Sequence, residues 1–316
     1  MSDILAQMAA LAADSPLQRV VNPWAALGLD EPVKSIQLYL KRDDLLHPQV
    51  SGNKWRKLKY NLLAARAQGH DTLLTFGGAY SNHLYATAAA GLAFGFRTVG
   101  IVRGDELASQ PRNPTLSFCE SCGMRLQFVS RAAYRDKDKP ACLAELVSQF
   151  GRCYILPEGG ANELAQQGVA ELIPEIQAQL GRAPDFVVCP VGTGSTWAGL
   201  VAAAPPQTSV LGIGVLMGAA QLPTIQAAVK ARPTAATTAV LDYALGGYAK
   251  TTPPLLDFIL AFENHTGVPL DPVYTAKMLY ALSDLTRRGH FPDNAIVVAI
   301  HTGGLQGRND RIMKGR

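Results

Sequence analysis

Residues 187–200, VVCPVGTGSTWAGL, contain an apolar run, a glycine-rich turn and a helix-like segment, in that order. The turn consists of Gly192, Thr193, Gly194, Ser195 and Thr196, so the backbone is accessible and hydroxyl donors stand beside it. Backbone N–H groups at a helix start, together with the helix dipole, bind phosphate. The stretch therefore predicts a strand that leads into a phosphate-binding cup.

The patterns that are missing from this turn indicate which kind of phosphate ligand it binds. A dinucleotide fingerprint needs glycine where Trp197 stands, and no Gly-Lys-Ser/Thr sequence of a P-loop follows. A phosphate monoester suits this cup better than a dinucleotide. Trp197 thus argues against a nicotinamide-dependent oxidoreductase, which we keep as an alternative.

The same alternation of strand-like and helix-like segments runs through the chain. Apolar β-branched runs separated by helices are typical of parallel sheets covered on both faces, so we predict an α/β fold. The predicted strands lie in 35–44, 71–78, 97–104, 125–130, 153–160, 185–195, 210–216 and 295–304, and the predicted helices at 54–68, 82–94, about 113–122, 140–149 and 196–204.

Glycines end four of these runs, at Gly77-Gly78, Gly159-Gly160, Gly192 and Gly303-Gly304. Ligands of open α/β sheets bind at the carboxyl ends of the strands, so the glycines favour one crevice lined by backbone. The alternative is that they only form turns.

The bulk composition limits the function classes. The 316 residues suggest two domains or one large one, and a net charge of +4 is too small to indicate a nucleic-acid or membrane partner. The first residues carry Asp3 and no basic segment, and the run ATAAAGLAFGF is too short to span a bilayer, so we expect a soluble, cytoplasmic protein. Cys119 and Cys122 form a single CESC, which we interpret as two reduced thiols rather than a redox pair or half a metal site; we predict no metal.

A second glycine turn precedes Ser81, Asn82 and His83 in TLLTFGGAYSNHLYATAAAG, residues 72–91. Ser81 and Asn82 at a helix start are typical N-caps. Free N–H groups and hydroxyls at the same point would also hold a substrate carboxylate.

Lys54 lies in QVSGNKWRKLKY, residues 49–60, directly after a Ser-Gly-Asn turn and at the start of a predicted helix. The helix dipole and the neighbouring cations Arg56, Lys57 and Lys59 are both expected to lower the pKa of its amine. The alternative is an ordinary solvated lysine. An amine activated in this way attacks carbonyls, and the monophosphate cup adds a phosphate site, so pyridoxal 5′-phosphate is the predicted cofactor.

The run VVAIHTGG, residues 297–304, ends in His301 and Thr302. A threonine hydroxyl can hydrogen-bond the cofactor's ring nitrogen without forcing its protonation, as an aspartate would. His301 is interpreted as a packed or capped histidine.

Taken together, these residues resemble the fold-type II, or tryptophan-synthase-β-like, pyridoxal-phosphate enzymes, and within them the D-cysteine desulfhydrase and 1-aminocyclopropane-1-carboxylate deaminase family. The resemblance extends over nearly the whole chain, through KRDD (41–44), GNKWRKL (52–58), SNH (81–83), PEGG (157–160), GTGSTWAG (192–199), LDPVYTAK (270–277) and IHTGG (300–304).

The resemblance implies a role for each residue. Lys54 would bind the cofactor's aldehyde and later remove the substrate's α-proton, Asn82 would bond the phenolic oxygen, and Thr302 would face the ring nitrogen. The loop 192–196, with Lys57, would hold the phosphate. Ser81 would sit beside the substrate and relay protons, and the substrate-facing residues would be Tyr80, Ser81, Asn82, His83 and Thr275. Tyr248 and Tyr274 match tyrosines that approach the substrate; buried sheet tyrosines are the alternative for both.

Two positions indicate the reaction within that family. The deaminases typically carry Glu where this chain has Thr275, and Leu where it has Thr302. Without that Glu the ring is a weaker electron sink, which favours β-elimination from D-cysteine over cyclopropane opening. Tyr80 replaces the common Gln and would narrow the entrance to the site, so another β-substituted amino acid stays open as the substrate.

The predicted architecture has a large domain from about 1–48 and 159–316 and a smaller α/β domain from 49–158, with the cofactor between them. The expected reaction releases pyruvate, ammonia and a thiol or sulfide from a small amino acid. The alternatives are a 1-aminocyclopropane-1-carboxylate deaminase that releases 2-oxobutyrate and a catalytically silent cofactor-binding protein. The resemblance also implies a homodimer.

Overall fold

The computed structural model describes residues 14–29, 35–50, 52–216, 237–240 and 243–308, with the single positions 4, 6, 8, 227 and 230. Ser51, the first residue of the predicted Ser-Gly-Asn turn, and most of 1–13 lie outside the described residues. The chain forms two compact units, one from His47–Gly168 and the other from Asp14–Leu46 with Val169–Arg316. The predicted domain boundaries stay a prediction.

The first unit contains a four-stranded parallel sheet in the order β5-β4-β3-β6. Its strands are β3 (Thr72–Gly77), β4 (Arg97–Arg103), β5 (Arg125–Val129) and β6 (Tyr154–Ile155), and its helices are α3 (Asn53–Ala67), α4 (Asn82–Phe94), α5 (Pro114–Ser121), α6 (Arg131–Arg135) and α7 (Pro140–Phe150). The boundary between the units falls within α8 (Glu163–Ala170).

Strand β4 shows why this sheet is covered on both faces. Val99 and Ile101 pack with Tyr134 of α6 and Leu146 of α7, whereas Val102 packs with residues of α4 and α5. Side chains alternate between the faces of a strand, so a run that is apolar at nearly every position needs helices on both sides.

The second unit contains a six-stranded sheet in the order β1-β2-β10-β7-β8-β9, in which only β1 is antiparallel. Its strands are β1 (Leu17–Arg19), β2 (Ile36–Lys41), β7 (Phe186–Val191), β8 (Ser209–Gly214), β9 (Thr237–Val240) and β10 (Ala295–Ile300), and its helices are α2 (Pro23–Ala26), α9 (Leu172–Leu180), α10 (Ser195–Ala203), α12 (Pro253–Thr266) and α13 (Thr275–Arg287).

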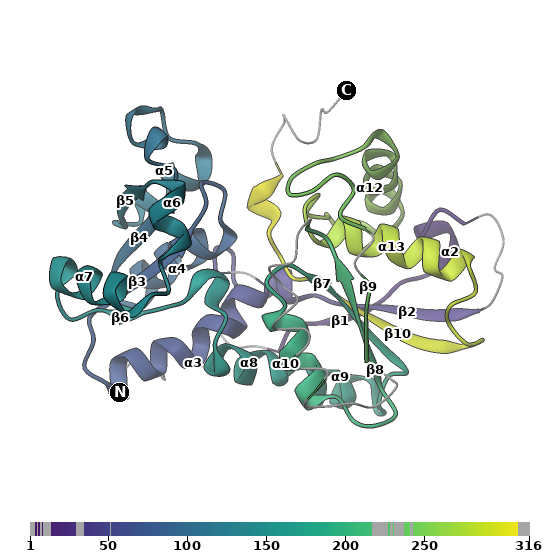
Figure 1. The fold of residues 1–316 in the computed structure, drawn as a ribbon. Helices are drawn as coiled ribbons and strands as arrows, with labels where there is room; N and C mark the ends of the chain where they lie inside the picture. The colour runs from purple at the N-terminus through teal and green to yellow at the C-terminus, as the bar shows by residue number, and fades with distance from the viewer. Residues whose placement is uncertain are drawn as a thin grey trace. The chain divides into compact units, whose positions relative to one another are not determined.

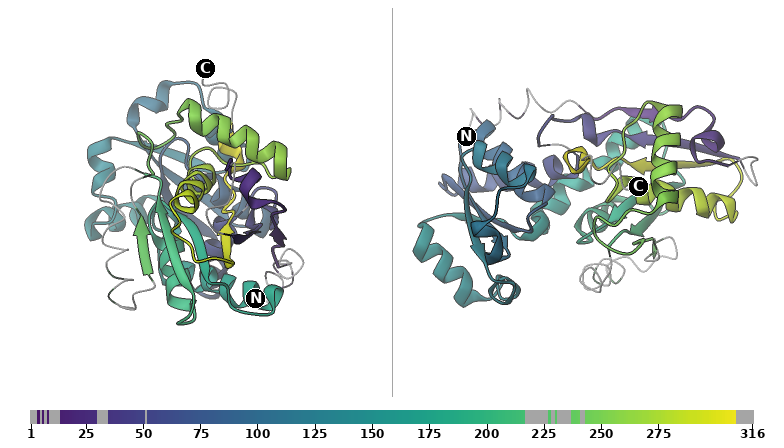
Figure 2. Two further views of the ribbon diagram at one scale, coloured as in Figure 1. Left: turned by 90° about the vertical axis from the view of Figure 1, so that its right-hand side faces the viewer. Right: turned by 90° about the horizontal axis from the view of Figure 1, so that it is seen from above.

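Helices α12 and α13 cover one face of the six-stranded sheet and α9 and α10 cover the other (Figure 1). Figure 2 shows the same layers from two further sides. Along β10, Val297 and Ala299 join the core under α12 and α13, while Ile296, Val298 and Ile300 join the core under α9 and α10. The predicted α/β fold with two mainly parallel sheets is therefore confirmed.

The predicted helices agree closely with the observed ones. Trp55, Leu58 and Leu62, predicted to share one face of the first helix, are all buried in α3. Helices α2, α6, α8, α9, α12 and α13 have no counterpart among the predicted elements. None of the helices in the described part of the chain is long and apolar enough to span a membrane.

Candidate active site

The predicted site residues fall into two groups, one in each unit. The first unit holds Lys54, Lys57, Tyr80, Ser81, Asn82 and His83, and the second holds Gly192, Thr193, Gly194, Ser195, Thr196, Tyr248, Tyr274, Thr275 and Thr302. Each group gathers at the carboxyl edge of its own parallel sheet, where ligands of α/β folds bind. The assembly of both groups into one site stays a prediction.

Lys54 is the second residue of α3, which begins after Gly52. The φ of Gly52 is +65°, a conformation that favours glycine, and Gly52 as the N-cap has no side chain to cap the helix. The Lys54 side chain is partly exposed, and Nζ donates a long hydrogen bond of 3.4 Å to the carbonyl oxygen of Gly159. Desolvation lowers the pKa of this amine to about 8. The predicted direction is confirmed, but its cause is burial rather than the neighbouring cations or the helix dipole.

Lys57 lies one turn further along α3 and is 2 % exposed. Its Nζ donates to the same Gly159 carbonyl oxygen at 3.3 Å. Strand β6 precedes Gly159, so two lysines of α3 meet at the end of that strand. Gly159 belongs to the PEGG stretch that the sequence analysis singled out. No local sequence pattern, however, predicts that its carbonyl oxygen accepts hydrogen bonds from two lysines far away in the chain.

The turn after β3 holds Ser81, the N-cap of α4, whose Oγ accepts from the N–H groups of His83 and Leu84, each at 3.2 Å. The capping interpretation is therefore confirmed for Ser81 but not for Asn82, and a catalytic role of Ser81 stays a prediction. A Cβ on Gly77 would lie 2.6 Å from Ser81 Oγ, so the turn requires glycine there for packing. Asn82 begins α4, and Tyr80 is 50 % exposed.

His83 is 2 % exposed, and neither of its buried ring nitrogens has a hydrogen-bond partner among the described residues. Its Cε1 would lie 3.1 Å from a Cβ added to Gly160, so the ring packs on the turn that also receives Lys54 and Lys57. Burial, followed by the charges of Lys54 and Lys57, holds the pKa of His83 well below its ordinary value. His83 is therefore neutral, and its predicted contact with substrate stays a prediction.

In the second unit, the 192–196 loop follows β7 and opens α10. Gly194 is the N-cap with a φ of +88° and has no side chain to cap the helix. Ser195 is 1 % exposed, and its Oγ has no hydrogen-bond partner among the described residues. Unsatisfied N–H groups of a first turn and an orphaned hydroxyl are the donor set that a phosphate monoester needs. The loop thus fits the phosphate of pyridoxal 5′-phosphate.

Tyr274 and Thr275 lie at the start of α13. A Cβ on Gly192 would lie 3.2 Å from Cε1 of Tyr274, so this ring packs directly on the phosphate cup. Thr275 is fully buried; its hydroxyl accepts the Asp271 N–H at 2.8 Å and donates to the Asp271 carbonyl oxygen at 3.2 Å. Its predicted contact with substrate stays a prediction.

Tyr248 is 46 % exposed, so the alternative of a buried sheet tyrosine does not hold for it. It lies in a turn with positive φ at Leu245, Gly246, Gly247 and Ala249. Positive φ is uncommon for non-glycine residues, and such conformations persist where surrounding contacts impose them. Here Lys277 Nζ donates to the carbonyl oxygens of Ala244 at 2.6 Å and Gly247 at 2.8 Å.

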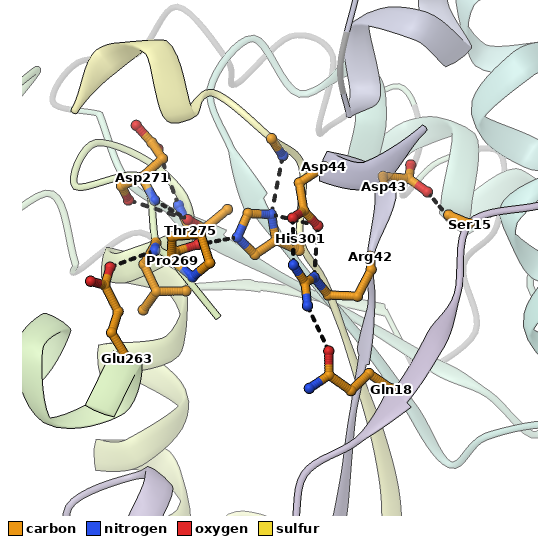
Figure 3. Close-up of polar contacts among 12 residues, drawn as sticks. Ser15, Gln18, Arg42, Asp43, Asp44, Glu263, Pro269, Asp271, Thr275 and His301 are labelled. Carbon is orange, nitrogen blue, oxygen red and sulfur yellow. Dashed lines mark hydrogen bonds and ion pairs between the residues drawn. The ribbon is translucent and has the colours of Figure 1, made fainter. Parts of the chain in front are cut away.

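Thr302 follows β10, which pairs in parallel with β7 on one side and β2 on the other. The two loops that carry Thr302 and the 192–196 cup therefore leave the sheet from neighbouring strands at the same edge. Thr302 is 6 % exposed. Its neighbour His301 is buried in a polar network that the sequence did not indicate (Figure 3).

Cys119 and Cys122 are free thiols at the end of α5, as predicted. Burial raises the pKa of Cys119 to about 12, so this thiol is not nucleophilic at neutral pH. The described residues contain no group of three or more His, Cys, Asp or Glu side chains that would hold a metal ion.

Comparison with known proteins identifies the family. The family profile "Pyridoxal-phosphate dependent enzyme" matches residues 16–303. The chain is 32 % identical over 93 % of its length, and 90 % of the relative's, to a Pyrococcus abyssi protein named "Putative 1-aminocyclopropane-1-carboxylate deaminase". It is 30 % identical to the mitochondrial bifunctional D-cysteine desulfhydrase/1-aminocyclopropane-1-carboxylate deaminase of Arabidopsis thaliana, over 92 % of this chain and 77 % of that protein.

The crystal structure of an ACC deaminase homologue superimposes with a TM-score of 0.79 at 27 % identity, over 99 % of this chain and 98 % of that one. These matches confirm the family resemblance inferred from the sequence. They exclude the alternative that the chain belongs to a family of nicotinamide-dependent oxidoreductases. The chain belongs to the pyridoxal-phosphate-dependent enzyme family, with the fold-type II architecture, and pyridoxal phosphate is its cofactor.

Proposed function

We propose that the protein is a lyase that catalyses β-elimination from D-cysteine or a related β-substituted amino acid, releasing pyruvate, ammonia and a thiol or sulfide. The relatives named above support a lyase of the desulfhydrase or deaminase type. Thr275 is the residue on which we base the choice between desulfhydrase and deaminase. Its hydroxyl is engaged by the backbone of Asp271, and no carboxylate side chain stands at the position where the deaminases typically carry Glu.

The neutral partner proposed for the ring nitrogen is then Thr302. A neutral partner leaves the ring a weaker electron sink, which suffices when a thiolate is the leaving group. Opening a cyclopropane demands a stronger sink. The Thr275 and Thr302 pair therefore favours β-elimination.

Each residue has a proposed task. Pyridoxal phosphate, when bound, supplies an aldehyde that captures the substrate's amine and a ring that withdraws electrons from its α-carbon. Lys54 would remove the α-proton, because a pKa of about 8 leaves a useful neutral fraction near neutral pH. The first turn of α10, the Ser195 hydroxyl and Lys57 would hold the phosphate. Asn82 would orient the ring through its phenolic oxygen.

The remaining residues would handle the substrate. The first turn of α4, at Ser81–His83, would hold the carboxylate through backbone N–H groups. Ser81, Tyr248 and Tyr274 would position the substrate or relay protons. Tyr80, half exposed at the turn, would restrict its size. We also propose that the enzyme is a cytoplasmic homodimer; light scattering of the purified protein tests the dimer.

Identification of the keto acid tests the proposal. The purified protein, saturated with pyridoxal phosphate, is offered D-cysteine, L-cysteine, β-chloro-D-alanine and 1-aminocyclopropane-1-carboxylate. We expect pyruvate from D-cysteine or β-chloro-D-alanine, and none in Lys54→Ala. The matched control is Lys59→Ala, since Lys59 lies on the same helix but contacts the ring of Tyr60.

The names of the relatives favour the cyclopropane deaminase as the second candidate. Release of 2-oxobutyrate from 1-aminocyclopropane-1-carboxylate, without pyruvate from the other substrates, would establish that activity instead. A yellow protein that turns over none of the four compounds would support a silent cofactor-binding protein.

A further inference from the structure

The buried network around His301 connects three segments of the second unit (Figure 3). The ring nitrogen Nε2 of His301 lies 2.8 Å from the carbonyl oxygen of Pro269, and Nδ1 lies 3.2 Å from Oδ1 of Asp44. The side chains of His301 and Asp44 are each 1 % exposed. The imidazole is therefore enclosed between two oxygen atoms that come from distant parts of the chain.

Asp44 is itself fixed in orientation. Arg42 donates to its two carboxylate oxygens, from Nε at 2.9 Å and from Nη2 at 2.7 Å, and donates from Nη1 to Gln18 at 2.6 Å. A two-pronged guanidinium–carboxylate pair restricts rotation and balances the buried charge. Arg42 and Asp44 thus form a rigid support for one edge of the imidazole.

At the opposite edge of the His301 ring, Nε2 carries a proton. A carbonyl oxygen only accepts hydrogen bonds, so Nε2 of His301 carries hydrogen and donates to Pro269. Nδ1 also receives a long contact of 3.4 Å from the Gly303 N–H. Burial lowers the pKa of His301, and Asp44 opposes that change. The ring is therefore held in one orientation, with the Pro269 oxygen at Nε2 and the Asp44 carboxylate at Nδ1.

The two segments that His301 joins carry residues of the proposed reaction. Thr302 follows it directly. Pro269 precedes Asp271, whose carboxylate accepts the backbone N–H groups of Tyr274 at 2.5 Å and Thr275 at 3.3 Å at the start of α13. One imidazole thus connects the residue proposed for the ring nitrogen with the helix start that presents Tyr274.

We propose that His301 is a positioning residue, supported by Asp44 and Arg42, that fixes Thr302 and the start of α13 relative to each other. The proposal rests on the proposed roles of Thr302 and Tyr274. A histidine that only fills the core would affect stability alone, whereas a positioning residue also affects the chemistry and the cofactor's spectrum.

Hydrogen exchange tests the positioning itself without reference to activity. In the cofactor-loaded His301→Gln protein, without substrate, we expect faster amide exchange in 269–276 and in 301–304 together, with 186–191 of β7 unchanged. Unchanged exchange in either segment, or an equal rise in β7, would overturn the proposal. Should His301→Gln not fold, Asp44→Asn carries the same test, because it removes the charge beside Nδ1 and retains the shape.

Kinetics and absorption connect the network to the reaction. We expect Asp44→Asn to lower kcat by about tenfold or more, with KM altered much less, since a displaced reacting group costs rate rather than binding. We also expect a shift in the visible band of bound pyridoxal phosphate. The control is Asp43→Asn, a neighbouring carboxylate that is also buried and whose Oδ1 accepts from Ser15 at 2.6 Å.

The outcomes separate this proposal from the proposed function. Equal effects of the Asp43 and Asp44 exchanges on kcat and on the band would overturn the positioning role. Faster exchange in both segments, together with a shifted band in a protein that turns over no amino acid, would support the positioning role and contradict the lyase.

Discussion

The starts of α3 and α13 each carry a lysine whose pKa is lowered to about 8 by burial, yet the two lysines are bonded differently. Lys54 is partly exposed and donates one long hydrogen bond, to Gly159. Lys277 is fully buried and donates to Ala244, Gly247 and, at 3.5 Å, Val215, with Asp271 nearby as a counter-charge.

The difference lies in how completely each ammonium is satisfied. A lysine has three donors, and Lys277 has an acceptor for each, so its protons are committed to holding the turn before Tyr248. Among the described residues, Lys54 Nζ makes one long hydrogen bond, which leaves its amine available for chemistry. A lowered pKa alone therefore does not identify a catalytic lysine; its hydrogen-bond partners must be examined as well.

The largest expected effect is the loss of turnover when Lys54 is replaced. We expect Lys54→Ala to reduce keto-acid release by roughly 10³-fold or more, because it removes the proposed base. Steady-state assays of the cofactor-saturated protein measure the loss. Borohydride treatment followed by peptide mass spectrometry should fix the cofactor on Lys54 in the wild type and leave Lys277 unlabelled. Labelling of Lys277 would reverse the comparison.

The next effect concerns stability. Lys277→Met leaves buried carbonyl oxygens without donors and Asp271 without its counter-charge, so we expect a loss of about 3 kcal/mol in the free energy of unfolding. Chemical denaturation of a Trp55→Phe background measures it, since the remaining Trp24 and Trp197 both lie in the unit of Lys277.

The matched exchange Lys54→Met should change the free energy of unfolding by less than about 0.5 kcal/mol. Similar losses in the two variants would show that both lysines are structural.

The pH dependence of cofactor capture sharpens the contrast further. Only the neutral amine attacks an aldehyde, so capture of pyridoxal phosphate by the apo protein should decline as pH falls through about 8. The neutral fraction of such an amine rises about tenfold from pH 7 to 9 and then levels off. Stopped-flow absorbance measures the rate; a rate that keeps rising towards pH 10.5 would indicate an ordinary lysine.

The same lowered pKa has a consequence for stability. Between pH 8 and 10.5 the unfolded chain binds more protons at Lys54 than the native chain does. The contribution of this residue to the free energy of unfolding therefore increases with pH across that interval. Lys277 acts in the same direction, since its pKa is lowered likewise.

The smallest effect separates ligand binding from folding in the phosphate cup. We expect Ser195→Ala to weaken pyridoxal phosphate binding about fivefold to tenfold and to leave the stability of the apo protein unchanged, because its buried hydroxyl has no partner among the described residues. Fluorescence titration and thermal denaturation measure the two quantities.

Ser283→Ala is the matched control, since that hydroxyl donates to the Leu27 carbonyl oxygen at 2.6 Å. It should lower stability by about 1 kcal/mol and leave cofactor affinity intact. A stability loss in Ser195→Ala would instead assign its hydroxyl to the fold.

Much of the fold was predictable because its signals are local. Apolar runs followed by glycine turns predicted the strands β3, β7 and β10, and the helix face of Trp55, Leu58 and Leu62 predicted how α3 packs. Helix α12 was missed although Pro253 marks its first turn. Helix propensity is only a weak indicator, and tertiary contacts often decide whether a segment becomes helical.

Most residues of the candidate site could be named from the sequence, but their burial and their hydrogen-bond partners could not. The sequence by itself determined a lysine at a helix start and hydroxyls at another, because both depend on neighbours within one turn of the chain. Desolvation of Lys54, the acceptor shared at Gly159 and the His301–Asp44 contact were decided only by the tertiary structure. Each of them requires segments far apart in sequence to exclude water from the same place, and no local pattern encodes that exclusion.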